Sequence, residues 1–120
     1  MRKLLVLVLI TLFLTACSTE TTYETISLDE IEGKVEDGYI VLDVREIHEF
    51  NEGHIPGAVN KPLSILQKGD FSQLSKDEKY IIICRSGNRS ITASDILSEE
   101  GYEVVNTSAG MSTWPGEIEK

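Results

Sequence analysis

Three apolar runs stand out along the chain, at residues 39–44, 80–83 and 102–106. The first two run without alternation between apolar and polar positions, which is typical of strands buried on both faces. Helix-like segments lie between the runs. A chain in which buried strands alternate with short helices predicts an α/β fold, with a small parallel sheet covered by helices on both faces.

Local signals place the remaining elements. Residues 27–30, SLDE, have the form of a capping box, in which a serine and a glutamate satisfy the first backbone groups of a helix. Gly101 stands where a glycine commonly ends a helix. In chain order we expect a helix to residue 36, a helix over 46–51, a strand over 58–60, irregular helical turns over 63–76, a helix over 90–100 and a short helix around 110–114.

The N-terminus has the pattern of an export signal. Arg2 and Lys3 precede an apolar run from Leu4 to Leu14. As a helix this run would be roughly 16 Å long, too short for a hydrocarbon core of roughly 30 Å. The following residues, LTAC, resemble a bacterial lipobox that ends in Cys17. An ordinary signal peptide with a chance cysteine is the alternative.

The predicted organisation is therefore a signal peptide at 1–16, a lipidated N-terminus with a tether at 17–24, and one domain at 25–118. The polar stretch 18–25 carries few apolar residues and predicts no strand. Cleavage before Cys17 would leave 104 residues and change the net charge from −9 to −11. This acidity argues against nucleic acid or an anionic lipid surface as a partner.

One cysteine remains for chemistry if Cys17 carries lipid. Cys84 directly follows the strand at 80–83 and opens the stretch CRSGNRS. Backbone N–H groups of a strand-to-helix loop can form an anion-binding nest, and Gly87 allows the necessary curl. Arg85 and Arg89 add positive charge, which favours thiolate over thiol. The stretch predicts a cradle around a reactive sulfur; a buried structural cysteine is the alternative.

Three stretches together resemble the rhodanese family of thiosulfate sulfurtransferases. CRSGNRS at 84–90 resembles its active-site loop, and VLDVRE at 41–46 with GHIPGAVN at 53–60 resembles its upstream signature. GYEVVNTSAGMSTWPG at 101–116 is similar to its C-terminal signature. The resemblance covers Thr25 to Glu117 and implies a five-stranded parallel sheet with helices on both sides.

The resemblance also implies roles for individual residues. Cys84 would be the nucleophile that takes a sulfane sulfur as a persulfide. A backbone cradle would be formed by Arg85, Ser86, Gly87, Asn88 and Arg89. Support for that loop would come from Asp43, Arg45 and Ser90.

Loop length favours sulfur transfer over phosphoryl transfer. Four residues separate Cys84 from Arg89, whereas the related phosphatases and arsenate reductases have five and a wider ring. The family usually has Gly-Gly where this chain has Ala109-Gly110, and often proline where Ile47 stands. We expect neither departure to contact the loop.

Two functions follow as hypotheses. The first is a double-displacement sulfurtransferase with a small sulfane-sulfur donor and a thiol or cyanide acceptor. The second is a persulfide carrier or partner-binding module without turnover. We expect no cofactor and no metal, because His48 and His54 lack a surrounding ligand pattern. Lipid on Cys17 would anchor the exported protein to a bacterial membrane.

Overall fold

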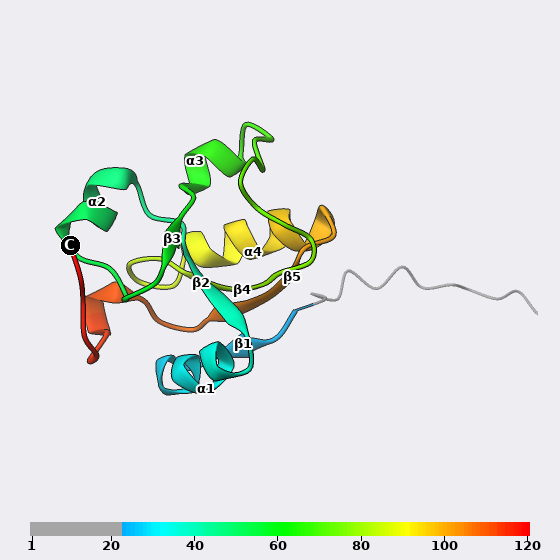
Figure 1. Ribbon diagram of the computed structural model, residues 1–120. Coiled ribbons are helices and arrows are strands. Elements are labelled where there is room, and N and C mark those ends of the chain that lie inside the picture. Colours follow the sequence, from blue (N-terminus) through cyan, green and yellow to red (C-terminus); the bar gives the residue numbers. More distant parts are fainter. Residues whose placement is uncertain (1–22) are drawn as a thin grey trace, which may run out of the picture.

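The computed structural model describes residues 23–120 (Figure 1). The predicted signal peptide and Cys17 lie outside these residues. In chain order the elements are β1 (Thr25–Ile26), η1 (Leu28–Glu30), α1 (Ile31–Glu36), β2 (Tyr39–Asp43), α2 (Ile47–Glu52), β3 (Val59–Asn60), α3 (Leu63–Leu66), β4 (Lys79–Ile83), α4 (Arg89–Glu99), β5 (Glu103–Thr107) and η2 (Met111–Thr113).

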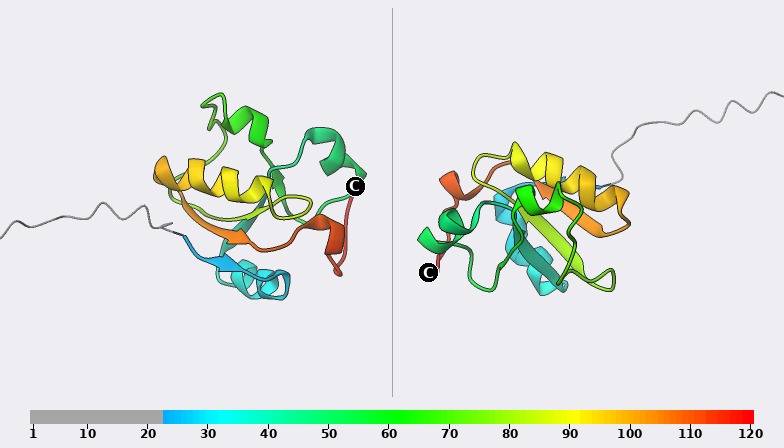
Figure 2. Two further views of the ribbon diagram at one scale, coloured as in Figure 1. Left: turned by 180° about the vertical axis from the view of Figure 1, so that it is seen from behind. Right: turned by 90° about the horizontal axis from the view of Figure 1, so that it is seen from above.

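The five strands form one sheet in the order β1-β5-β4-β2-β3, and every pair is parallel. Figure 2 shows α1 on one side of the sheet and α3 with α4 on the other. The predicted α/β fold with helices on both faces is confirmed. No helix among residues 23–120 has the length and apolarity needed to cross a bilayer.

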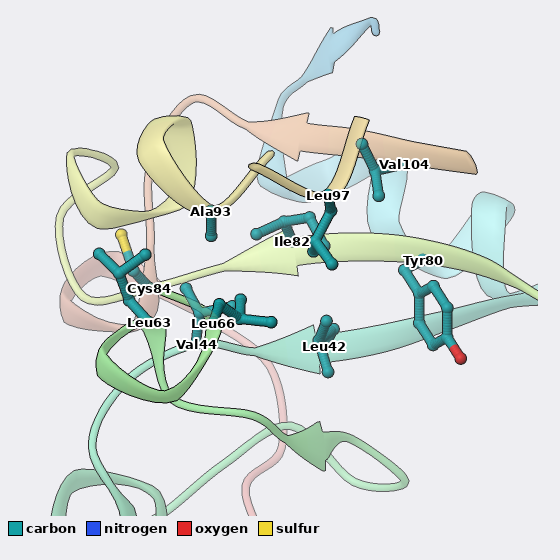
Figure 3. Packing of buried hydrophobic residues seen from close by; sticks show 10 residues of the cluster. All are labelled: Leu42, Val44, Leu63, Leu66, Tyr80, Ile82, Cys84, Ala93, Leu97 and Val104. Carbon is teal, nitrogen blue, oxygen red and sulfur yellow. The ribbon is translucent and has the colours of Figure 1, made fainter. Parts of the chain in front are cut away.

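Side chains of β4 alternate between two cores. Tyr80 and Ile82 point to the face covered by α3 and α4 (Figure 3). Ile81 and Ile83 belong to the opposite core, which includes Ile31 of α1. All four are at most 3% exposed. Burial on both faces is the physical reason for the uninterrupted apolar run in this strand.

One strand near the N-terminus was not predicted. Thr25, the first residue of the predicted domain, is also the first residue of β1 and pairs with Asn106 on β5. Just before it, the Tyr23 hydroxyl donates to Asp95 on α4, and the pKa of Tyr23 rises to about 12 because of burial and this carboxylate. A strand of two residues is too short to produce a periodic pattern, so the polar sequence concealed it.

Helix α4 is the long element that follows the Cys84 loop. It ends as the sequence predicts: Gly101 has φ +93°, and the Tyr102 N–H donates to the Leu97 carbonyl at 3.0 Å. Leu97 is fully buried in the core shared with β4, whereas Ile91 on the same helix is 47% exposed.

We therefore expect two truncations on α4 to have very different effects. Leu97→Ala should lower the free energy of unfolding by about 2–5 kcal/mol, because it leaves a cavity in the core. Ile91→Ala removes a similar side chain from the surface and should change it by less than about 0.5 kcal/mol. Denaturant titration of the domain measures both, and equal losses would contradict the packing described for this helix.

Candidate active site

Cys84 lies at the carboxyl edge of the sheet, between the end of β4 and the start of α4 (Figure 3). Its thiol is 1% exposed and packs beside Val44 and Leu63. Ligands of open α/β sheets bind outside this edge, at the carboxyl ends of the strands. The structure therefore places the one cysteine of residues 23–120 where a binding loop is expected.

The loop directs its hydrogen-bond donors at the sulfur. The Gly87 N–H lies 3.1 Å from Cys84 Sγ. Burial raises the pKa of the Cys84 thiol, but hydrogen bonds from the Ser90 hydroxyl and from the backbone N–H groups of Ser90, Gly87 and Ser86 outweigh it. The pKa consequently lies below its ordinary value, and the site favours the thiolate.

Ser90 has a larger part than loop support. Its buried hydroxyl lies 3.2 Å from the Gly87 carbonyl and 3.5 Å from the Thr107 carbonyl, and it also reaches the sulfur. One hydroxyl proton cannot serve all three acceptors at once. A charged sulfur is the stronger acceptor, so we expect the proton to turn to Cys84 when the thiolate forms.

Arg89, which the sequence predicts to add positive charge near the sulfur, has Glu49 as its main partner. Its guanidinium forms two hydrogen bonds to Glu49 on α2, at 2.6 and 2.9 Å. The pKa of Glu49 falls to about 2 chiefly because of this pair. The pKa of Arg89 is raised first by Glu49 and less by Cys84. The arginine mainly ties the loop to α2, and hydrogen bonds do most to stabilise the thiolate.

The other loop side chains face solvent. Arg85, Ser86 and Asn88 are exposed, so the curl of the backbone rather than these side chains surrounds the sulfur. Arg85 borders a hollow of about 310 Å³ beside the loop. Its wall also includes Arg45, Glu49, Glu52, Met111 and Ser112.

Asp43 and Arg45 form a buried ion pair in the turn between β2 and α2. Arg45 Nη2 lies 2.7 Å from Asp43 Oδ2 and 2.8 Å from the Gly53 carbonyl, and both side chains of the pair are buried. The Asn60 amide donates to the carbonyls of Asp43 and Arg45, at 2.9 Å each. These contacts hold the β2–α2 turn, while the Val44 N–H donates to the Ile83 carbonyl directly before the cysteine.

The C-terminal segment contacts the loop, which corrects the expectation for Ala109-Gly110. The Met111 N–H donates to the Cys84 carbonyl at 2.9 Å, and the Ser112 N–H donates to the Arg85 carbonyl at 3.0 Å. A Cβ on Gly110 would lie 2.4 Å from the Cys84 carbonyl oxygen. Gly110 is therefore required by close packing on the loop. Ile47 fits the expectation better, since it is 55% exposed.

Sequence reasoning missed three residues of this site. Glu49, Met111 and Ser112 were not singled out as candidates, although the last two lie inside the C-terminal signature. Glu49 has no local signal, because its partner Arg89 is forty positions away.

Within residues 23–120, acidic, histidine and cysteine side chains do not gather into a group of three that could hold a metal. His54 instead contacts the Phe50 carbonyl and Glu119.

Comparisons with known proteins agree with this geometry. "Putative sulfurtransferase YtwF" of Bacillus subtilis is 42% identical over 81 residues, which cover 64% of this chain and 74% of that protein. "Putative sulfur carrier protein YrkF" of the same organism is 38% identical over 97 residues, which cover 78% of this chain but only 52% of that protein. The chain thus spans about half the length of YrkF.

A solved structure and a family model complete the comparison. The rhodanese-related protein of Thermoplasma volcanium superposes with a TM-score of 0.73 and 33% identity, covering 81% of this chain and 98% of the other. The model of the rhodanese-like domain matches residues 27–117. This match takes in strands β2 to β5, the Cys84 loop and the C-terminal segment, and the chain belongs to the rhodanese-like domain family.

Proposed function

We propose that this domain transfers sulfane sulfur through a persulfide on Cys84, with thiosulfate or a similar anion as donor. The observation that carries the proposal is the hydrogen-bonded sulfur: a thiol with a lowered pKa inside a loop of converging donors. A cysteine thiolate is the nucleophilic form of the residue. Relatives named as sulfurtransferases support the same reaction class.

The first step is a displacement at the outer sulfur of the donor. The Cys84 thiolate forms a new S–S bond to that sulfur, and the S–S bond of thiosulfate breaks with its electron pair on departing sulfite. Cys84 is left as a persulfide anion, so charge and atoms balance. The donors that stabilise the thiolate, among them the Gly87 N–H and the Ser90 hydroxyl, can move to the terminal sulfur.

The second step returns the enzyme to its starting state. A nucleophilic acceptor, cyanide or a thiolate, attacks the terminal sulfur, and the electron pair of the breaking S–S bond returns to Cys84 Sγ. Cyanide leaves as thiocyanate, and a thiol leaves as a persulfide. This sequence is a double displacement with one covalent intermediate.

A persulfide carrier without independent turnover is the second candidate function. It is favoured by the likeness to a protein named as a sulfur carrier. The same Cys84 persulfide would then form, but a partner protein would load or unload it. The two functions differ in whether the isolated domain turns over small donors and acceptors.

Localisation at a membrane through lipid on Cys17 also belongs to the proposal. The chain enters the domain at β1, where Thr25 pairs with Asn106, the next-to-last residue of β5. Asn106 also pairs with Ile82, two positions before Cys84. Strand β1 therefore lies toward the carboxyl edge of the sheet, the edge that carries the Cys84 loop.

Replacement of Cys84 tests the intermediate. Cys84→Ser should abolish thiosulfate:cyanide turnover, because the hydroxyl cannot hold a persulfide at this site. Intact mass of thiosulfate-treated wild type should show one added sulfur that cyanide removes. A wild type that gains the sulfur but does not turn over would favour the carrier. A wild type that gains no sulfur would contradict transfer from thiosulfate and would leave only a carrier that a partner protein loads.

Ser90 is expected to set the pKa of Cys84. The thiolate fraction rises as pH rises through the pKa, so loss of a hydrogen bond to the thiolate should move the alkylation midpoint of Cys84 to higher pH. Ser90→Ala should show this shift. Ser94→Ala is the matched control, because Ser94 is also fully buried on α4 and contacts Asn106 instead. The rate of iodoacetamide alkylation as a function of pH measures the midpoint. Identical midpoints in Ser90→Ala and the wild type would argue against the hydroxyl as donor.

Cys17→Ser tests the anchor in the expressing bacterium. The wild type should sediment with membranes, since a bacterial lipoprotein carries at least two acyl chains and anchors stably. The variant should lose the lipid mass and appear in the soluble exported fraction. A wild type that is exported and wholly soluble would contradict the lipobox.

A further inference from the structure

A second hollow, of about 530 Å³, lies between α1 and the segment that follows η2. We refer to it as the α1 groove. Ile31 and Ile55 line it and are at most 6% exposed, while Val35 beside them is 46% exposed. Trp114 also lines the groove. An apolar lining with an exposed valine and an indole is unusual on so acidic a protein, and such patches mark interaction sites.

Local packing fixes the indole in the groove. Trp114 Nε1 donates to the Glu117 carbonyl at 2.9 Å. The intervening Gly116 passes so close that a Cβ there would lie 2.6 Å from the ring. The chain therefore folds back over the tryptophan, and glycine is what allows this approach. A rigid aromatic side chain loses little entropy when a partner binds to it, which is why tryptophan is common at binding hot spots.

Three carboxylates border the same groove. Glu32, Glu36 and Glu117 line it with exposed side chains, and none of them takes part in an ion pair within residues 23–120. The lysine of α1, Lys34, pairs with Glu24 instead. An apolar floor with unpaired negative charge at its border matches a cationic side chain that carries an apolar stem.

We propose that the α1 groove binds a basic segment of a partner protein, in which arginine or lysine alternates with apolar residues. The aliphatic stem or guanidinium plane of the bound residue lies against Trp114, and its charge meets the three carboxylates. The net charge of −9 favours a cationic partner and opposes both an anionic lipid surface and a second copy of this chain.

The groove also adjoins the Cys84 loop through the backbone. The Trp114 N–H donates to the Met111 carbonyl at 3.3 Å, and the Met111 N–H donates to the Cys84 carbonyl at 2.9 Å. A partner seated in the groove therefore sits next to the segment that holds the cysteine. We assign it as the protein that delivers or accepts the sulfur; this assignment rests on the proposed function, whereas binding to the groove does not.

The groove contains the single tryptophan of the chain, so fluorescence reports its occupancy directly. The probe is a short synthetic peptide in which arginine and leucine alternate; the same peptide with glutamate for arginine is the control. At physiological salt the basic peptide should bind and change the Trp114 emission, and the acidic peptide should not. An unchanged emission with the basic peptide would overturn the proposal.

Two charge-matched variants separate the groove from general acidity. Glu32→Gln/Glu36→Gln/Glu117→Gln removes the carboxylates of the groove and should weaken the basic peptide by about tenfold. Glu99→Gln/Glu100→Gln/Glu103→Gln removes three exposed carboxylates at the other edge of the sheet and should change affinity less than about twofold, because screening acts over about 8 Å. Equal losses in both variants would show nonspecific attraction and overturn the proposal.

Persulfide formation on Cys84 is measured on the same samples by intact mass. If the groove variant loses peptide affinity but gains sulfur from thiosulfate like the wild type, the groove is a separate docking surface, as proposed. If the peptide binds as expected and neither the wild type nor any variant gains sulfur, the proposal that the groove binds a basic segment is supported and the proposed function is contradicted. If the wild type gains sulfur but sedimentation shows that the peptide acts by dimerising the protein, the assignment of a partner segment fails.

Discussion

The backbone N–H groups of the Cys84 loop point at one sulfur atom. The need to keep the loop in this curled conformation constrains the elements around it. The loop can curl only because Gly87 adopts φ +97°. Any side chain there would also collide with the Ser108 carbonyl, since a Cβ would lie 2.9 Å away. The segment after β5 must therefore pass close over the loop. Gly110 permits that approach on the other side, against the Cys84 carbonyl.

The same hydrogen bonds explain how a strongly acidic protein could attract the anionic donor that we propose. Charges far from the sulfur are screened over about 8 Å at physiological salt. The donors to Cys84 lie in direct contact with it, in a buried site where interactions are less screened. Arg89 interacts with the sulfur, but its ion pair with Glu49 offsets part of its positive charge there. Fixed dipoles rather than free cations would thus provide most of the attraction for that donor.

A feature of this structure can be predicted from the sequence when the residues that form it are close together in the chain. Strand β4, the stop at Gly101 and the cradle after Cys84 are local, and all three follow from neighbouring residues. The partner of Arg89 and the packing of Gly110 on the loop join residues far apart, so no local pattern reveals them. Strand β1 could not be predicted for another reason. Its two residues form a strand because they pair with β5, and not because of their own β propensity.

Burial of the sulfur limits what can reach it. Cys84 is 1% exposed, so the donor that we propose would have to present a small, projecting sulfur atom, as thiosulfate does. A persulfide moves the reactive atom outward by about 2 Å, the length of an S–S bond. That extension is enough for a small acceptor and short for a folded protein. A protein acceptor in the proposed reaction would consequently have to hold its thiol at a fixed angle to the loop during the transfer. The α1 groove lies beside the segment whose Met111 N–H donates to the Cys84 carbonyl. A partner bound there would already be aligned with the loop, so little additional entropy would be lost in the transfer step.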